Sequence, residues 1–214
     1  MMENDIEILK KYLVPKFDIG LIDDTSNFPE SWKRIYQSKN KVEMFLSVFK
    51  TFDILQNFMQ YVGPYIDNVL FVKVDDAEYL IIKIIMPDKT IFYYGGLNPC
   101  LSNAELLKTV ALPENIKSFY EQFIDGFYDI KYGHMGLYSL QDVDNVDDYE
   151  WSFLPENIIL KNYYIFFSNG AGAYLISNKH NFKTYLIYTD SDSKSVADFE
   201  GYIDKWLVDA LTYY

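Results

Sequence analysis

Three runs of β-branched and aromatic residues lie between residues 69 and 94, and only short polar breaks separate them. The breaks contain Asp75-Asp76 and Pro87-Asp88, and residues of these types favour turns. Short turns between β-branched and aromatic runs are typical of paired antiparallel strands. The runs are residues 69–74, 79–86 and 90–94. The pattern predicts a three-stranded antiparallel meander that is closed by Gly95-Gly96.

Apolar side chains recur at helical spacing on the N-terminal side of this meander. Residues 5–13 show this spacing, and residues 52–62 show it up to Gly63-Pro64, which ends the pattern. The sequence therefore predicts two helices in this part of the chain. Residues 42–50 fit either a strand or a helix, and residues 16–40 carry no clear pattern.

The strongest helical signal follows Leu112-Pro113. Proline is favoured in the first turn of a helix, and Gly126 stands where a glycine commonly follows the end of one. The apolar residues between them follow helical spacing: Ile116, Phe119, Tyr120, Phe123 and Ile124. The sequence predicts an amphipathic helix here and a short helix before it, at residues 104–109.

Short strands and one final helix are predicted in the rest of the chain. The strands are residues 136–141, 158–160, 163–168, 173–177 and 184–189, and Asn169-Gly170 favours a tight turn between two of them. The helix is predicted to begin at Ser195, with Asp198 completing a start that resembles a capping box. Its predicted buried stripe is Val196, Phe199, Ile203, Trp206, Ala210 and Leu211. Helices and antiparallel strands without regular alternation predict an α+β fold, an antiparallel β-sheet with helices packed on it.

The net charge of −12 on 214 residues narrows the class of partner. A chain this acidic is repelled by phosphate backbones and by anionic membrane surfaces, so we expect neither nucleic acid nor a membrane as partner. A basic protein would be attracted, although the same charge also serves solubility alone. The 20 Tyr residues suit the core, a binding face or both.

The cysteine content and the N-terminal residues indicate the cellular compartment in which the protein works. Cys100 is the single cysteine, so no intramolecular disulfide is possible, which suits a reducing cytoplasm. The N-terminal residues lack the basic and apolar regions of a signal peptide, and no apolar run is long enough to span a bilayer. We therefore expect a cytoplasmic protein.

The reactive residue types do not form a catalytic or metal-binding signature in the sequence. His134 and His180 lie in predicted turns without metal-ligand spacing, and no nucleophile motif surrounds Cys100. Gly170-Ala171-Gly172 leads into a strand, so it favours a hairpin over a phosphate-binding loop. The sequence predicts a protein that is not an enzyme and that uses no metal and no cofactor.

Aspartates gather in two segments of the second half. The first resembles a calcium loop, but Asp147 stands where such a loop needs glycine. Two interpretations remain: solvated loops, or a docking surface for a basic protein partner. The candidate partner-binding residues are Asp142, Asp144, Asp147, Asp148, Asp190 and Asp192.

The second half also carries an ordered series of motifs. It comprises Leu112-Pro113 opening an aromatic helix, Gly126, a Gly-Leu strand at residues 136–140, the segment 164–176 and a closing helix at residues 199–207. In this order and spacing, residues 110–214 resemble the SUKH superfamily. That superfamily groups bacterial immunity proteins with fungal cell-wall synthesis regulators of the Smi/Knr type.

The resemblance implies a fold and a role. The fold is an antiparallel sheet with helices packed against it, and the role is a cytoplasmic antidote to a toxin. Residues 1–109 are then an N-terminal α+β extension of a SUKH-like domain at residues 110–214, or both parts form one continuous globular unit. The resemblance implies no catalytic residues.

Three hypotheses of function follow. The first is an immunity protein that neutralises a cognate bacterial toxin, such as a basic nuclease, by steric and electrostatic occlusion. The second is a non-enzymatic regulatory scaffold, by analogy with the cell-wall synthesis regulators. The third is a hydrolase that uses two carboxylates, which requires a deep pocket where two acids with strongly shifted pKa values converge. Of the three, the sequence favours the immunity protein.

Overall fold

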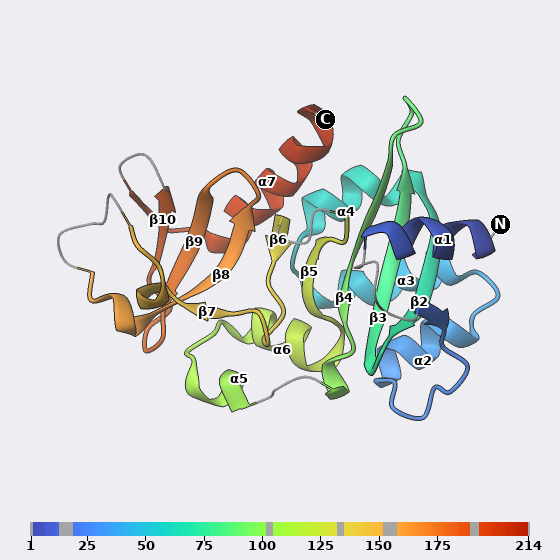
Figure 1. The fold of residues 1–214 in the computed structure, drawn as a ribbon, viewed down its shortest axis with the longest axis horizontal. Coiled ribbons are helices and arrows are strands. Elements are labelled where there is room, and N and C mark those ends of the chain that lie inside the picture. Colours follow the sequence, from blue (N-terminus) through green and yellow to red (C-terminus); the bar gives the residue numbers. More distant parts are fainter. Residues whose placement is uncertain are drawn as a thin grey trace.

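The computed structural model describes residues 2–12, 19–101, 105–131, 135–151, 158–188 and 193–213. These residues form seven α-helices and one antiparallel sheet of eleven strands (Figure 1), which confirms the α+β prediction. The strand order is β1-β2-β3-β4-β5-β6-β8-β9-β10-β11, and β7 pairs with β8 beside this path. The strands are β1 Ile19–Leu21, β2 Ile66–Val74, β3 Ala77–Ile85, β4 Ile91–Leu97, β5 Asp125–Asp129, β6 Met135–Leu137, β7 Asp144–Asn145, β8 Tyr163–Asn169, β9 Ala173–Asn178, β10 Thr184–Tyr188 and β11 Lys194–Val196. The helices are α1 Met2–Tyr12, α2 Glu30–Gln37, α3 Lys41–Phe49, α4 Gln56–Val62, α5 Glu105–Thr109, α6 Glu114–Gln122 and α7 Phe199–Tyr213.

The predicted meander is present as β2, β3 and β4, which pair with their neighbours in antiparallel register. The prediction that Gly95-Gly96 closes the meander is wrong, because both glycines lie inside β4. A Cβ atom on Gly96 would lie 2.3 Å from the carbonyl oxygen of Gly126 on β5. The glycine therefore allows a close approach of two strands and does not mark a turn.

The predicted helix over residues 52–62 starts later than expected. A short 3-10 turn precedes it, and Leu55 takes a left-handed conformation with φ of 54°, so α4 begins one residue further on. The buried Asp204 carboxylate on α7 accepts hydrogen bonds from the backbone N–H groups of Asn57 and Phe58, at 2.9 and 2.6 Å. This carboxylate satisfies N–H groups that have no partner within the helix. A contact across the fold thus fixes a boundary that the local pattern does not.

Three boundaries in the second half also differ from the predictions. α6 ends at Gln122, and Gly126 lies in β5 with φ of 79° instead of following a helix. The strand predicted at residues 136–141 ends at Leu137 as β6, where the chain turns away. No strand forms at residues 158–160: residues 158 and 159 are irregular, and Leu160 begins a 3-10 turn.

The last helix begins at Phe199, so the predicted start at Ser195 is wrong. The residues before it pair with β10 as β11, the short edge strand of the sheet. Asp198 does cap the helix, since its Oδ1 accepts a hydrogen bond from the backbone N–H of Gly201 at 2.9 Å. Within the predicted stripe, Val196 and Trp206 are only partly buried; the buried members are Phe199, Ile203, Ala210 and Leu211.

The remaining predicted elements are confirmed within the described residues. Residues 5–13 and 104–109 correspond to α1 and α5, and residues 42–50 are helical as α3. The strands at residues 163–168, 173–177 and 184–189 correspond to β8, β9 and β10. The turn at Asn169-Gly170 joins β8 to β9 as expected.

The two faces of the sheet are covered differently. Helices α2, α3, α4, α6 and α7 pack on one face and enclose the main core, which is rich in buried Phe side chains. On the other face α1 crosses β2, β3 and β4 (Figure 1), where Leu9 packs in a smaller core with Leu70 and Ile81. A third cluster, centred on Ile165 and Ile176, lies on β8, β9 and β10. This second face of the sheet therefore carries two separate apolar clusters, one under α1 and one on β8 to β10.

The sheet runs without a break across the predicted boundary between residues 109 and 110. β4 from residues 1–109 pairs with β5 from residues 110–214, and the main core draws on both parts. The division into an extension and a SUKH-like domain stays a prediction. In the described residues, no helix has both the length and the apolar character that crossing a membrane requires.

Candidate functional site

A cavity of about 480 Å³ opens on the sheet face that carries α1. It lies between the cluster under α1, which includes Tyr128, and the cluster on β8 to β10, which includes Ile165. Its wall combines four tyrosines with two carboxylates: Tyr128, Tyr138, Tyr149, Tyr174, Asp142 and Asp144. We call this cavity the tyrosine cleft.

Strand alternation places two of these tyrosines in the cleft. Successive side chains of a strand point to opposite faces of the sheet. On β5, Phe127 enters the main core and Tyr128 faces the cleft. On β9, Leu175 enters the main core and Tyr174 faces the cleft. The two strands are far apart in the sequence but are separated in the sheet only by β6 and β8, so the sheet order brings the two tyrosines to one cleft.

Backbone contacts fix Tyr138, which follows β6. Its N–H donates to the carbonyl oxygen of Phe166 at 2.9 Å, and its own carbonyl oxygen accepts a bond from the Tyr120 hydroxyl at 2.8 Å. Burial raises the pKa of Tyr138 to about 12, against a smaller lowering effect of Ser168. The phenol therefore stays protonated and neutral at physiological pH.

The two carboxylates of the cleft each hold one hydroxyl group. The Ser139 hydroxyl donates to Oδ2 of Asp142 at 2.5 Å, and the Tyr149 hydroxyl donates to Oδ2 of Asp144 at 2.5 Å. The bond to Asp144 raises the pKa of Tyr149 to about 12. Asp144 is itself placed by β7, where it pairs with Ile165 on β8.

Trp151 braces two of the tyrosines. Its ring centroid lies 6.0 Å from that of Tyr149 and 5.6 Å from that of Tyr174. Its indole N–H donates to the carbonyl oxygen of Val146 at 2.8 Å. These contacts give the cleft a preformed aromatic wall, although Tyr149 keeps 47% of its surface exposed.

The cleft carries negative charge that the described part of the chain does not neutralise. The ion pairs formed by described residues include neither Asp142 nor Asp144. The raised pKa values of Tyr138 and Tyr149 keep these two side chains neutral, so they add no charge to the cleft. The site is therefore suited to a positively charged ligand that can pack against aromatic rings.

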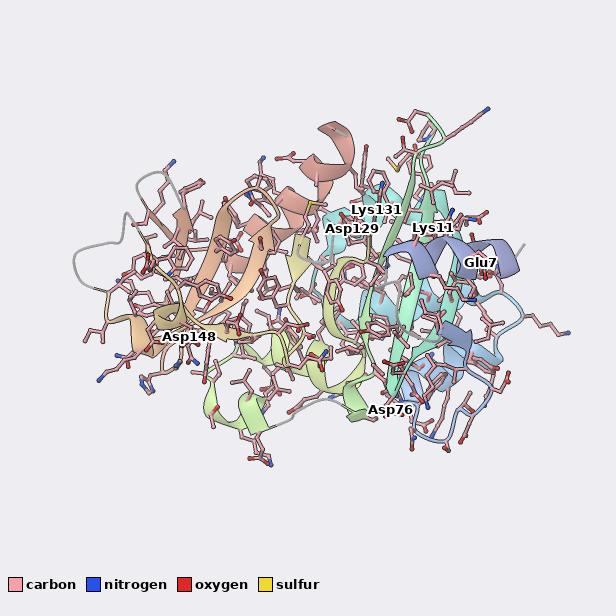
Figure 2. All side chains as sticks on the ribbon, viewed as in Figure 1. Glu7, Lys11, Asp76, Asp129, Lys131 and Asp148 are labelled. Carbon is pink, nitrogen blue, oxygen red and sulfur yellow. The ribbon has the colours of Figure 1, made fainter. Side chains whose placement is uncertain are left out.

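The six aspartates predicted from the sequence separate into three groups. Asp142 and Asp144 line the cleft. Asp147 and Asp148 are exposed on the 3-10 turn after β7, and Figure 2 shows Asp148 on the part of the chain that borders β8 and β9. Asp190 and Asp192 lie outside the described residues. The structure thus brings two of the six into one site.

The sequence did not predict that these four tyrosines meet in one site; only the abundance of tyrosine was apparent. One signal was available in the strand patterns. In Phe127-Tyr128 and Tyr174-Leu175 an apolar residue alternates with a tyrosine, which marks opposite faces of the sheet. Tyr138 follows the short strand β6 and Tyr149 follows a 3-10 turn, and the sequence does not reveal the limits of these elements.

The other candidate residues do not join the cleft. His180 is exposed in the turn after β9, and its backbone N–H donates to Oδ1 of Asn178 at 2.9 Å. His134 lies outside the described residues. Partial burial raises the pKa of the Cys100 thiol, which lowers its thiolate fraction. Among the described residues, no three His, Cys, Asp or Glu side chains gather as a metal site would require.

Known proteins offer no further guide to this site. No family model, no curated protein and no solved structure matches the chain. The SUKH resemblance of residues 110–214 therefore remains an interpretation of motif order and spacing.

Proposed function

We propose that this protein is an immunity protein that binds a basic toxin at the tyrosine cleft and neutralises it by occlusion. The observation that carries the proposal is the cleft itself, a tyrosine wall around unneutralised carboxylates in a chain of net charge −12. The motif order of residues 110–214 supports the same role. No catalytic residues are assigned.

Tyrosines of this kind are effective in protein interfaces. Tyr supplies a large apolar surface and one polar group, and it is enriched among the residues that dominate binding energy. The exposed Tyr149 and the partly buried Tyr138 and Tyr174 offer such surface next to charge. The bracing by Trp151 limits the rotamer entropy that binding would remove.

The charge indicates the class of toxin. Proteins that act on nucleic acids carry Lys and Arg for the phosphate backbone, so a nuclease presents a basic face. An acidic surface attracts such a face, accelerates encounter and covers the residues that contact substrate. Because a nuclease toxin acts on nucleic acid inside the cell, the proposed place of action is the cytoplasm.

The first test is co-expression with toxin candidates encoded next to this gene. The wild-type protein should prevent killing by one of them and form a complex with that toxin in purified form. If no neighbouring product is neutralised, and a regulatory protein forms the stable complex instead, the scaffold hypothesis replaces this proposal.

The second test concerns the charges. Asp142→Asn/Asp144→Asn should weaken toxin binding at low salt by about tenfold or more, with a smaller loss at high salt. The control Asp75→Asn/Asp76→Asn removes the same charge from the β2–β3 turn, where Figure 2 shows Asp76. Equal affinities for the two double variants would remove the electrostatic part of the proposal.

A further inference from the structure

We infer that the tyrosine cleft binds one arginine side chain of the partner, with its guanidinium group against the Asp142 and Asp144 carboxylates and among the tyrosine rings. The inference rests on the proposed function and specifies the chemistry of the contact. Hydrogen bonding, aromatic geometry and cavity size each support it.

The carboxylates retain hydrogen-bonding capacity. Each uses Oδ2 for a neighbouring hydroxyl, and no donor from the described residues pairs with Oδ1 of Asp142 or Asp144. A guanidinium group carries five N–H donors in a planar fork and remains charged at any pH where the protein is folded. One such group can therefore donate to two separate carboxylates at once.

The aromatic wall suits a planar cation. Guanidinium groups stack on aromatic faces, and Tyr149 and Tyr174 are held in place through Trp151. The chain already places a cation on a tyrosine elsewhere on this part of the sheet, where Nζ of Lys179 lies 4.0 Å from the centroid of the Tyr164 ring. The protein thus already holds a cation against a tyrosine ring at another place in the fold.

Arginine fits better than the other cations. A lysine ammonium is compact and strongly hydrated, so it gains less from stacking and loses more hydration on entry. A metal ion requires several carboxylates or nitrogen ligands, and no group of three exists among the described residues. The volume of about 480 Å³ falls in the range of small-ligand sites, so a whole side chain can enter.

The experiment uses N-acetyl-L-arginine amide as probe of the full-length protein, with the Trp151 indole N–H resonance as the readout. N-acetyl-L-lysine amide and N-acetyl-L-citrulline amide serve as comparison probes, because citrulline keeps the shape of arginine and removes its charge. We expect the arginine probe to shift this resonance with a millimolar dissociation constant. Binding of the citrulline probe should be at least tenfold weaker, and that of the lysine probe severalfold weaker.

Two variants assign the binding to the cleft. Asp142→Asn/Asp144→Asn should weaken arginine-probe binding at least tenfold, and Tyr174→Ala should weaken it severalfold. Asp75→Asn/Asp76→Asn should leave it unchanged. Equal binding of the arginine and citrulline probes, or an unchanged affinity in Asp142→Asn/Asp144→Asn, overturns the inference.

This experiment separates the inference from the proposed function. If a toxin is neutralised through the cleft while the arginine probe does not bind there, the inference fails and the proposed function stands. If the arginine probe binds as expected while no toxin is neutralised, the cleft is an arginine-binding site and the immunity role fails.

Discussion

Tyr138 shows how one side chain of the cleft depends on burial. It is partly buried and packs against the cluster on β8 to β10. Burial raises its pKa to about 12 from an ordinary value of 10, because the phenolate would lose its hydration inside the fold. The neutral phenol is thus the form that the folded protein accommodates.

This shift predicts a loss of stability in alkali. Between pH 10 and 12 the folded protein binds more protons than the unfolded chain, so the free energy of unfolding falls as pH rises. Below pH 10 the phenol is protonated in both states and contributes no pH dependence. The free energy of unfolding, measured by urea denaturation at steps of about half a pH unit from about pH 8 to about pH 11.5, should show this fall. Tyr138→Phe should make the fall shallower, and an unchanged slope would contradict the assignment.

The sequence identifies the charged residues of the cleft better than its aromatic ones. Asp142 and Asp144 stand in an acidic segment, which is a local feature that a linear chain displays. Tyr128 and Tyr174 become neighbours of one cavity only because β5, β6, β8 and β9 follow one another in the sheet. Such proximity depends on strand order, which no short pattern encodes.

At the scale of elements, the start of β5 depends on Gly126. Its φ of 79° is a conformation that L-residues with a side chain rarely adopt, and a Cβ atom there would lie 2.6 Å from the backbone nitrogen of Ser139. The same strand start places Asp125, whose Oδ1 accepts a bond from the backbone N–H of Leu140 at 2.7 Å. Gly126 therefore lets β5 pass close to the segment that follows β6.

Gly126→Ala should lower the free energy of unfolding by at least about 2–3 kcal/mol, from backbone strain and from displacement of the neighbouring backbone. Gly20→Ala on β1 is the control, because a Cβ atom there meets nothing within 4 Å. Its effect should stay within about 0.5 kcal/mol. Urea denaturation followed by circular dichroism measures both. Similar losses in the two variants would show that Gly126 carries no special constraint.

Elements with a clear local pattern were predictable, and elements that depend on distant partners were not. β2, β3 and α6 are nine residues long each, and local patterns predict most of their residues. β1, β7 and β11 have two or three residues each and exist because a neighbouring strand pairs with them. Their stability comes from partners distant in sequence, so local propensity gives no signal.

At the scale of the whole molecule, two structural links cross the middle of the chain. The first is the pairing of β4 with β5 in the sheet. The second is the Asp204 carboxylate of α7, which holds the start of α4 through two backbone bonds. Because the main core also spans both parts, neither residues 1–109 nor residues 110–214 enclose a complete core alone. We therefore expect one cooperative unfolding transition.

Asp204→Ala tests this coupling. It leaves backbone N–H groups at the start of α4 without an acceptor, so the free energy of unfolding should fall by about 2–3 kcal/mol. Asp209→Ala on the same helix is the matched control: its pair with Lys205 is exposed and should matter by about 0.5 kcal/mol or less. The indole resonances of Trp32 on α2 and Trp206 on α7 report the two parts separately. In Asp204→Ala both should disappear at one lowered urea concentration, because the sheet and the main core join the two parts. Loss of the Trp206 signal before the Trp32 signal would instead show that residues 110–214 unfold as an independent unit.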